Sequence, residues 1–495
     1  MQGFLSALAV LFSPTCLLYL LLGAFAGVVL GSIPGLSGGT GLVIMLPLTF
    51  HMDANLAIAT LVGIYIGGVS GGYIGSILLG IPGTTNSIAT VYDGYEMTKK
   101  GEAVRALSAA ATANFIGTAP SVLIALFASN WISSWAVKLG PWEYFSLMLC
   151  ALTLVITLSQ GNVAKGMIAM GLGLLIAAVG YAPICGTKRF TFGTYYLYGG
   201  VSFVDVMMGL FAGTTILLEF ARNAKSSQAD IVKISRFKLP VKDFADNKIN
   251  VIRSWFLGLV IGFLPGMGGT LANMVAYAQE KSSSKHPELL GTGCVDGVIA
   301  PEIANNASIG GAIIPMVSLG IPGDGACALL MAALTLQGVQ PGPLFSTNSP
   351  VLFNLIFLAA ALAAVGVFIL EIVGMPLFPA LLKIPYHFLY PVIVVLVFAG
   401  AYMASNNMFD VFMMLIAILL GVVLQYFKIP SAPLILSVVL GGNIETYLRR
   451  GCNMAENGWH AFFTRPVSLI LLIVAFVCVV VSVFGPLFKK SAKKA

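Results

Sequence analysis

Charged side chains are scarce in this sequence. Only 9% of the 495 residues are Asp, Glu, Lys or Arg, and 58% are hydrophobic, whereas a soluble domain carries about 25% charged residues. This composition excludes an ordinary soluble domain. Apolar runs close to the roughly 20 residues that a helix needs to cross a bilayer lie at 104–129, 142–160, 201–220, 351–374, 409–427 and 466–488. The sequence therefore predicts an all-α, polytopic membrane protein.

Motifs for metal, redox and nucleotide chemistry are also missing. The seven cysteines include no CxxC pair, so we expect them to be small apolar residues in helix packing. No nucleotide-binding loop is present, so an ATP-driven pump would need another subunit. The net charge of +7 lies in loops and in the lysine-rich tail, which is typical of membrane topology and not of nucleic-acid binding. The N-terminus lacks the basic region of a cleavable signal peptide.

Glycine and proline, by contrast, are abundant inside the apolar segments. The stretch GSIPGLSGGTG at 31–41 is followed 231 residues later by GFLPGMGGT at 262–270. Likewise, LLGIPGT at 78–84 is followed 240 residues later by SLGIPGD at 318–324. The order is the same in both copies, with 48 and 57 residues between the prolines of successive motifs. We interpret the chain as a duplication.

Loop charges indicate how the two copies are oriented. In the first copy, residues 51–55 contain no Lys or Arg and residues 99–105 contain three. In the second copy, residues 281–285 contain two lysines and residues 338–350 contain none. Cytoplasmic loops collect Lys and Arg, so the copies are predicted to lie in opposite orientations. Inverted repeats of this kind are a feature of secondary transporters.

The predicted organisation follows from this pattern. We expect a first inverted repeat at 1–220, a cytoplasmic basic linker at 221–250 and a second inverted repeat at 251–495. Each repeat is expected to contain one re-entrant hairpin, at 16–50 or 252–280, and one broken helix. Basic residues lie on both sides of the last apolar run, so the side of the C-terminus stays open.

The four glycine-rich breaks predict one enclosed site between the repeats. Non-helical backbone survives at membrane depth only inside protein or around a polar cavity. An exposed helix N-terminus suits a carboxylate, whereas helix C-termini and unwound carbonyls suit Na⁺. The candidate substrate- and ion-binding residues are Ser37, Gly38, Gly39, Thr40, Gly83, Thr84, Thr85, Asn86, Ser87, Gly268, Gly269, Thr270, Asn273, Gly323, Asp324 and Gly325. The candidate Na⁺ ligands among them are Ser37, Asn86, Thr270 and Asp324. No catalytic residue is expected, and no cofactor other than a coupling ion, Na⁺ or H⁺.

Acidic residues within membrane sequence are functional candidates by default. Asp324 replaces Thr84 of the first copy, and it is predicted either to couple an ion or proton or to cap the following helix. Asp296 and Glu302 lie upstream, and the role of Glu302 stays open between function and structure. Asn305 and Asn306 are expected to join helix packing. Trp131, Trp135 and Trp142 are expected to form an interfacial belt.

Two other classes of protein are consistent with parts of the sequence. The GLSG motif at 35–38 matches that of intramembrane serine proteases, but such an enzyme needs a histidine base next to its serine. The four histidines lie in loops or at the ends of apolar runs, and His51 is fourteen residues from Ser37. Glycine-rich re-entrant loops also form channel filters. Two inverted, non-identical copies favour alternating access over a symmetric pore.

Four long motifs resemble one family. GSIPGLSGGTGLVIMLPLTF, LLGIPGTTNSIATVYDGYEMTKKGEA, GFLPGMGGTLANMVAYAQEK and GVIAPEIANNASIGGAIIPMVSLGIPGDGA are similar to the large membrane subunit of the bacterial tripartite tricarboxylate transporters, the TctA family. QPGPLF, RFTFG, ETYLRR and RPVS extend the resemblance over nearly the whole chain. It implies a multi-pass inner-membrane transporter that moves carboxylates by an elevator motion driven by Na⁺ or H⁺. It also implies two partners, a small four-helix membrane subunit and a periplasmic solute-binding protein.

Overall fold

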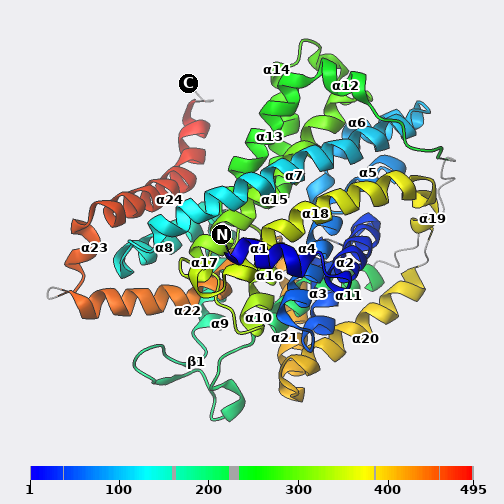
Figure 1. Cartoon of the computed structure of the whole chain (residues 1–495). Helices are drawn as coiled ribbons and strands as arrows, with labels where there is room; N and C mark the ends of the chain where they lie inside the picture. Colours follow the sequence, from blue (N-terminus) through cyan, green and yellow to red (C-terminus); the bar gives the residue numbers. More distant parts are fainter. Residues whose placement is uncertain are drawn as a thin grey trace.

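The computed structural model describes residues 2–36, 38–158, 163–221, 234–383, 386–455 and 458–492, and these are almost entirely helical (Figure 1). Up to residue 221 the elements are α1 (Gln2–Leu11), α2 (Pro14–Ser32), α3 (Gly38–Met45), η1 (Leu46–Thr49), α4 (Ala54–Ser70), α5 (Gly72–Leu79), η2 (Thr85–Ser87), α6 (Thr90–Lys99), α7 (Ala103–Ala136), α8 (Pro141–Leu158), α9 (Val163–Ala177), η3 (Tyr195–Leu197), α10 (Phe203–Met207), the π-helical η4 (Met208–Gly213) and α11 (Thr214–Ala221). The strands β1 (Gly180–Tyr181) and β2 (Lys188–Arg189) form a short antiparallel hairpin with Gly180 opposite Arg189.

The elements from residue 234 onward are also helices. They are α12 (Val241–Asp246), α13 (Lys248–Phe263), α14 (Gly268–Ser283), η5 (Pro287–Leu289), α15 (Asp296–Leu319), α16 (Gly325–Leu336), α17 (Phe345–Asn348), α18 (Pro350–Gly374), η6 (Met375–Leu377), α19 (Phe378–Leu381), α20 (Tyr386–Ser405), α21 (Met408–Tyr426), α22 (Ser431–Met454), α23 (His460–Thr464) and α24 (Pro466–Ala492).

The structure confirms a polytopic helical membrane protein. Within the described ranges, six helical segments are long and apolar enough to cross a membrane: Pro14–Ser32, Ala54–Leu79, Ala103–Ala136, Phe203–Ala221, Pro350–Leu381 and Met408–Tyr426. Four of the predicted apolar runs lie on these segments, and the other two lie on α8 and α24. At the left of Figure 1, α8 packs against α22 and α24, apart from the central helices.

Glycines bring two helix pairs into close contact. Helix α2 packs against α4, and α13 packs against α15. Gly31 of α2 lies against the carbonyl oxygen of Gly68, and Gly262 of α13 lies against that of Ser308. Neither glycine has room for a Cβ atom. Backbones can approach this closely only where small residues form the interface, so these glycines set the spacing within each pair.

The predicted breaks lie at the ends of long helical segments. In the first copy α4 and α5 together cover Ala54–Leu79 with an interruption at Gly71, and in the second copy α15 continues for 24 residues. Both end at a left-handed glycine, Gly80 or Gly320, each with φ of 70°. The chain then turns back, so that the Gly83 amide donates to the Gly72 carbonyl at 3.2 Å. The glycine-proline motif therefore reverses the chain after a full helix, because Gly permits positive φ and Pro cannot continue a regular helix.

The tryptophan prediction is wrong for one of its three residues. Trp131 and Trp135 are exposed on α7, as an interfacial belt requires. Trp142 is buried instead, and its indole N–H donates to the Gly451 carbonyl at 3.0 Å. A buried indole needs such a partner. Trp142 therefore joins α8 to α22.

Candidate substrate and ion site

A cavity of about 460 Å³ lies where segments from both copies of the repeat meet. Most of the residues that the sequence singled out line it: Gly38, Gly39, Thr40, Thr84, Thr85, Asn86, Gly268, Gly269, Thr270, Asp324 and Gly325. These residues come from the two hairpin turns and the two chain reversals. The paired glycine motifs thus line a single cavity.

Four helices begin at the cavity wall. They are α3, α14, α16 and α22, whose first residues include Gly38, Gly268, Gly325 and Ser431. The first N–H groups of a helix have no partner within the helix, and the helix dipole adds a partial positive charge there. No side chain caps the start of α14 or α22. The cavity therefore offers backbone N–H groups from several directions.

The cavity contains almost no formal charge. Its described lining includes no Lys, Arg or His, and Asp324 is the only acid. The favourable field for an anion therefore comes from helix N-termini and hydroxyl groups. Such an arrangement binds carboxylate or phosphate groups without a basic side chain.

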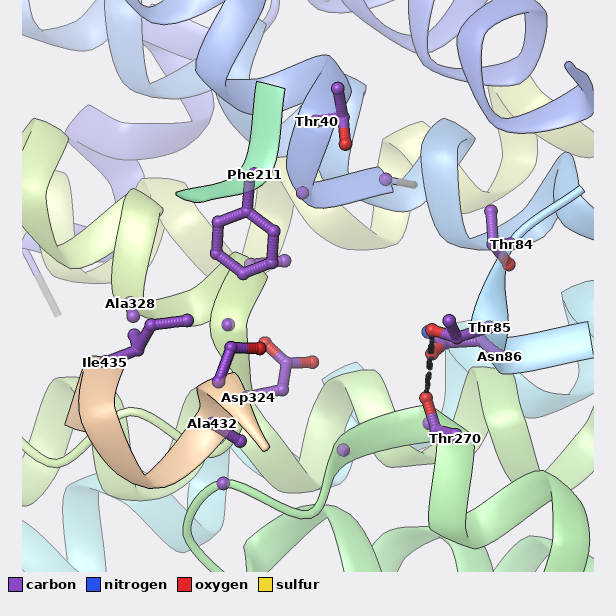
Figure 2. Close-up of a pocket in the computed structure, with 18 of the residues that line it drawn as sticks. Thr40, Thr84, Thr85, Asn86, Phe211, Thr270, Asp324, Ala328, Ala432 and Ile435 are labelled. Carbon is purple, nitrogen blue, oxygen red and sulfur yellow. Dashed lines mark hydrogen bonds between the residues drawn. The ribbon is translucent and has the colours of Figure 1, made fainter. Parts of the chain in front are cut away.

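Polar and apolar side chains occupy different parts of the wall. The Thr270 hydroxyl donates to Asn86 Oδ1 at 2.7 Å and contacts the Thr85 hydroxyl at 3.2 Å. Figure 2 shows these three residues together, with Phe211 and Ile435 on another part of the wall. The bond from Thr270 to Asn86 joins α14 to the η2 turn. It thus links two segments that the sequence assigns to different copies.

Asp324 caps α16 and contacts a tyrosine of the first copy. Its Oδ1 accepts a hydrogen bond from the Cys327 amide at 2.6 Å, and its Oδ2 accepts one from the Tyr65 hydroxyl at 2.8 Å. The carboxyl group is half-buried and faces the cavity (Figure 2). The capping geometry is as expected for Asp. Cavity exposure also leaves the group accessible to an ion, so its structural and functional roles are compatible.

Four of the predicted site residues that the structure describes are not part of this wall. Ser37 lies outside the described residues, and with it the serine of the protease hypothesis. Gly83 and Gly323 are pressed against neighbouring backbone. Ser87 is buried behind the wall, and its hydroxyl has no partner. Asn273 is also buried, where its Oδ1 accepts from the Ala89 amide at 2.8 Å.

The candidate Na⁺ ligands among the described residues, Asn86, Thr270 and Asp324, all line the cavity. Asn86 and Thr270 bond to each other, whereas Asp324 lies beside Gly268 on a separate part of the wall (Figure 2). No group of three or more His, Cys, Asp or Glu suited to a metal exists in the described part of the chain. Na⁺ accepts neutral oxygen ligands, so the hydroxyl and amide groups stay relevant.

Sequence reasoning missed three features of the site. Tyr65 lies in an ordinary apolar helix, and nothing in its local sequence indicates its bond to Asp324. Phe211 enters from the π-helical η4, where the Gly209 carbonyl accepts a hydrogen bond from the Thr214 hydroxyl at the start of α11 at 2.8 Å. π-Helical turns are frequent at functional sites. Ser431 follows Pro430, and this Pro before a helix was the one available signal.

The polar residues of α15 divide into two groups. Asn306 joins helix packing as expected, because its amide bonds to the side chains of Ser70, Asn114 and Thr118. Asn305 is also fully buried, but its amide atoms have no hydrogen-bond partner among the described residues. Glu302 is fully buried. Asp296, at the start of the helix, accepts a hydrogen bond from Asn247 at 2.6 Å.

Comparison with known proteins gives a family and two relatives. Residues 17–436 match the family model described as the tripartite tricarboxylate transporter TctA family. An uncharacterized 52.8 kDa protein of Agrobacterium vitis, described by its place in the TAR-I ttuC' 3' region, is 34% identical over 99% of this chain and 97% of its own length. An uncharacterized protein of the TAR-II ttuC' 3' region of the same organism is 37% identical over 47% of this chain and 96% of its own length.

Proposed function

The chain belongs to the tripartite tricarboxylate transporter TctA family, and we propose that it carries a di- or tricarboxylate across a bacterial inner membrane by ion-coupled alternating access. The observation that supports this most is the convergence of helix N-termini, those of α14 and α22 without a side-chain cap, on a cavity whose described lining has no basic side chain. A carboxylate accepts hydrogen bonds from free N–H groups, and the helix dipoles favour its charge. Phe211 and Ile435 would then contact the carbon skeleton of the substrate.

Asp324 is the residue through which we propose coupling to an ion. A carboxylate substrate in this cavity would lie beside the Asp324 carboxyl group, and like charges repel. A bound Na⁺ or a proton on Asp324 removes that repulsion. Substrate and ion would then favour each other's binding, which is the coupling free energy that a symporter needs.

The packing of the helices supports an inverted duplication. Besides the pairs α2–α4 and α13–α15, helix α7 packs against α15 and α18 packs against α4. If α4 corresponds to α15 and α7 to α18, the contact between α7 and α15 in one copy matches the contact between α18 and α4 in the other. The loop contacts also separate into two groups. Gln337 donates to the Thr49 carbonyl at 3.2 Å, whereas Arg105 forms a salt bridge with Asp243 at 2.7 Å.

These two groups of contacts support the orientation that the charge pattern predicts. Residues near 50 and 340 would face the periplasm, and residues near 100 and 243 would face the cytoplasm. Residues 222–233 of the predicted basic linker lie outside the described residues. The proposed units remain 1–220 and 251–495, joined by 221–250. An elevator motion would carry the hairpins α2–α3 and α13–α14 together with the cavity between them.

Two partners complete the proposal. The family is tripartite, so we propose that a small four-helix membrane subunit and a periplasmic solute-binding protein act with this chain. Delivery by a binding protein would supply high-affinity capture. The described chain has only the short β1–β2 hairpin and loops outside its helices, and these form no capture domain.

Uptake in proteoliposomes tests the proposed function. The chain would be reconstituted with its small partner and binding protein, and labelled citrate, succinate and other di- and tricarboxylates would be supplied under separate Na⁺ and pH gradients. We expect saturable accumulation of at least one carboxylate that collapses with one of the gradients. We expect the chain alone to accumulate little. Passive flux that does not saturate would indicate a channel, and no flux of any carboxylate would refute the proposal.

A further inference from the structure

Two buried glutamates lie outside the cavity without a basic partner. Glu302 of α15 and Glu371 of α18 are both 0% exposed. One oxygen of Glu302 accepts a hydrogen bond from the Thr90 hydroxyl at 2.5 Å, and its other oxygen has no partner. Neither oxygen of Glu371 has a partner among the described residues. Unpaired buried carboxyl groups are rare, because an ionised carboxylate in this position is very costly.

The two carboxyl groups belong to one cluster. Helices α15 and α18 both pack against α7, where Asn114 bonds to Asn306 of α15 and Ser108 contacts Met375 at the end of α18. The two carboxyl groups and the Tyr73 phenol interact electrostatically there. Tyr73 is also 0% exposed, and its hydroxyl has no partner. The Asn305 side chain lies beside Glu302, and both of its amide atoms are unpartnered. Four side chains in one buried place thus have unused hydrogen-bonding capacity.

Among the described residues, no other ionisable group neutralises this cluster. On α6, the Asp93 carboxyl accepts hydrogen bonds from the Tyr277 hydroxyl and from the backbone amides of Gly291, Gly293 and Cys294. On α13 and α14, Arg253 pairs with Glu280, and at the start of α7 Arg105 pairs with Asp243. Asp296 of α15 bonds to Asn247. Tyr73 is the only other described titratable group that acts on either glutamate.

A proton on one of the two glutamates would remove the repulsion between them and provide a hydrogen-bond donor. Two carboxylates in one apolar place cannot both ionise at low cost, because burial and mutual repulsion both favour the neutral form. A protonated carboxyl group is a donor as well as an acceptor, so a proton on Glu371 or Glu302 supplies the missing hydrogen bonds. Na⁺ would instead need a cage of several oxygen ligands, and an exchange of salts distinguishes the two ions.

The cluster adjoins the wall of the cavity. The Asn305 Oδ1 atom lies directly against Gly269 at the tip of the α13–α14 hairpin, with the Asn86 amide on the same side. Glu302 is three residues away on the same helix. The Thr90 hydroxyl, which donates to Glu302, also contacts the Asn273 amide of α14 at 3.4 Å. A movement of α14 would therefore change the hydrogen bonding of Glu302.

We propose that Glu302, Glu371 and Tyr73 form a proton-binding site that exchanges one proton with water and senses the α13–α14 hairpin. The carboxyl O–H is the only bond that forms on loading and breaks on release. The coupling of this proton to transport rests on the proposed function. The proton site itself does not, so it can be tested on the purified chain without a substrate.

Infrared spectroscopy of the full chain tests the site. The C=O stretch of a protonated carboxyl group is separate from the carboxylate bands and shifts in D₂O. We expect a protonated band at neutral pH that loses intensity in Glu371→Gln and in Glu302→Gln. The matched control is Glu288→Gln, because Glu288 is an exposed loop residue. A spectrum unchanged in both buried variants would overturn the proposal.

Replacing choline chloride with NaCl distinguishes a site that binds a proton from one that binds Na⁺. A proton site keeps its protonated band in both salts. Loss of that band in Na⁺, in wild type but not in the variants, would show that the glutamates bind Na⁺, and would also overturn the proposal. Gln keeps the size and most polar contacts of Glu, so elution as a single folded species would accompany each spectrum.

Transport measurements test the coupling separately. With the carboxylate identified by the uptake panel, we expect Glu371→Gln to lose accumulation driven by a pH gradient while it retains counterflow exchange. Unchanged pH-driven accumulation in this variant would refute coupling through Glu371. If no carboxylate is transported, the proposed function fails, and the infrared result still decides whether the proton site exists.

Discussion

The Tyr65 hydroxyl donates a hydrogen bond to Asp324 Oδ2 at 2.8 Å, across 259 residues of sequence. Tyr65 is fully buried in α4, whereas Asp324 faces the cavity at the start of α16. One bond thus joins a helix of the first copy to the cap of a helix of the second. A change in the charge of Asp324 would therefore alter its hydrogen bond to Tyr65 of α4.

Asp324→Asn should separate coupling from folding. Asn is about as good an N-cap residue as Asp, so we expect normal insertion and normal counterflow exchange. Accumulation against a gradient should be lost, because the variant can neither carry a proton nor attract Na⁺ with a full charge. Uptake with and without an ion gradient measures both. Tyr65→Phe is the control, since it keeps the charge of Asp324 and removes only the contacts of the Tyr65 hydroxyl with Asp324 and Cys327, at about 1 kcal/mol for a hydrogen bond. Wild-type accumulation in Asp324→Asn would leave only the capping role.

Gly262→Ala should destabilise the α13–α15 pair. A Cβ at this position would collide with the Ser308 carbonyl, and overpacking of this kind costs about 1–3 kcal/mol. We expect a lower melting temperature in detergent. Gly171→Ala is the matched control, because Gly171 lies in helix α9 with open space around it. Equal melting temperatures for the two variants would show that the close approach does not hold the pair together.

Single cysteines should report opposite orientations of the two copies. We expect residues 51–55 and 340–350 to react with an impermeant reagent from the periplasmic side, and residues 99–105 and 281–287 from the cytoplasmic side. Cys185 is the exposed native thiol among the described residues, so it would first be replaced by Ser. Labelling of 51–55 and 281–287 from the same side would disprove the inverted repeats.

The Arg189–Glu445 pair predicts a pH-dependent stability. Burial alone would raise the pKa of Glu445, but hydrogen bonds from Arg189 and Arg449 outweigh burial and lower it. With the folded pKa below the unfolded value of about 4.3, the stabilisation is present above that pH and is lost as the pH falls through the folded pKa. We expect Glu445→Gln to lower the melting temperature at neutral pH.

The difference between this variant and wild type should shrink below about pH 4. Thermal unfolding over a pH series measures it, and Glu288→Gln serves as the exposed control. A difference that stays constant down to strongly acidic pH would show that the charge of Glu445 does not contribute.

The sequence predicted where functional segments lie better than how they are shaped. Paired motifs led to Asn86 and Thr270, and the structure brings both into one hydrogen bond, because segments with free backbone groups must be enclosed together. The same motifs show where a helix ends but not where the chain goes next, so the reversal at Gly80 was missed. The contact of Tyr65 with Asp324 was missed, and Trp142 was wrongly assigned to the membrane interface. Both roles depend on partners far away in the sequence.

The helix starts around the cavity have an evolutionary consequence. A binding site built from arginines can lose its preference for anions through one substitution, because the charge resides in a side chain. Main-chain N–H groups are present whichever residue is encoded, and only proline removes one. Substitutions at Phe211, Ala328 or Ile435 could therefore change which carbon skeleton fits while the capacity to hold a carboxylate persists. In the proposed transporter, the preferred acid could therefore change in evolution while the binding of its carboxylate group is retained.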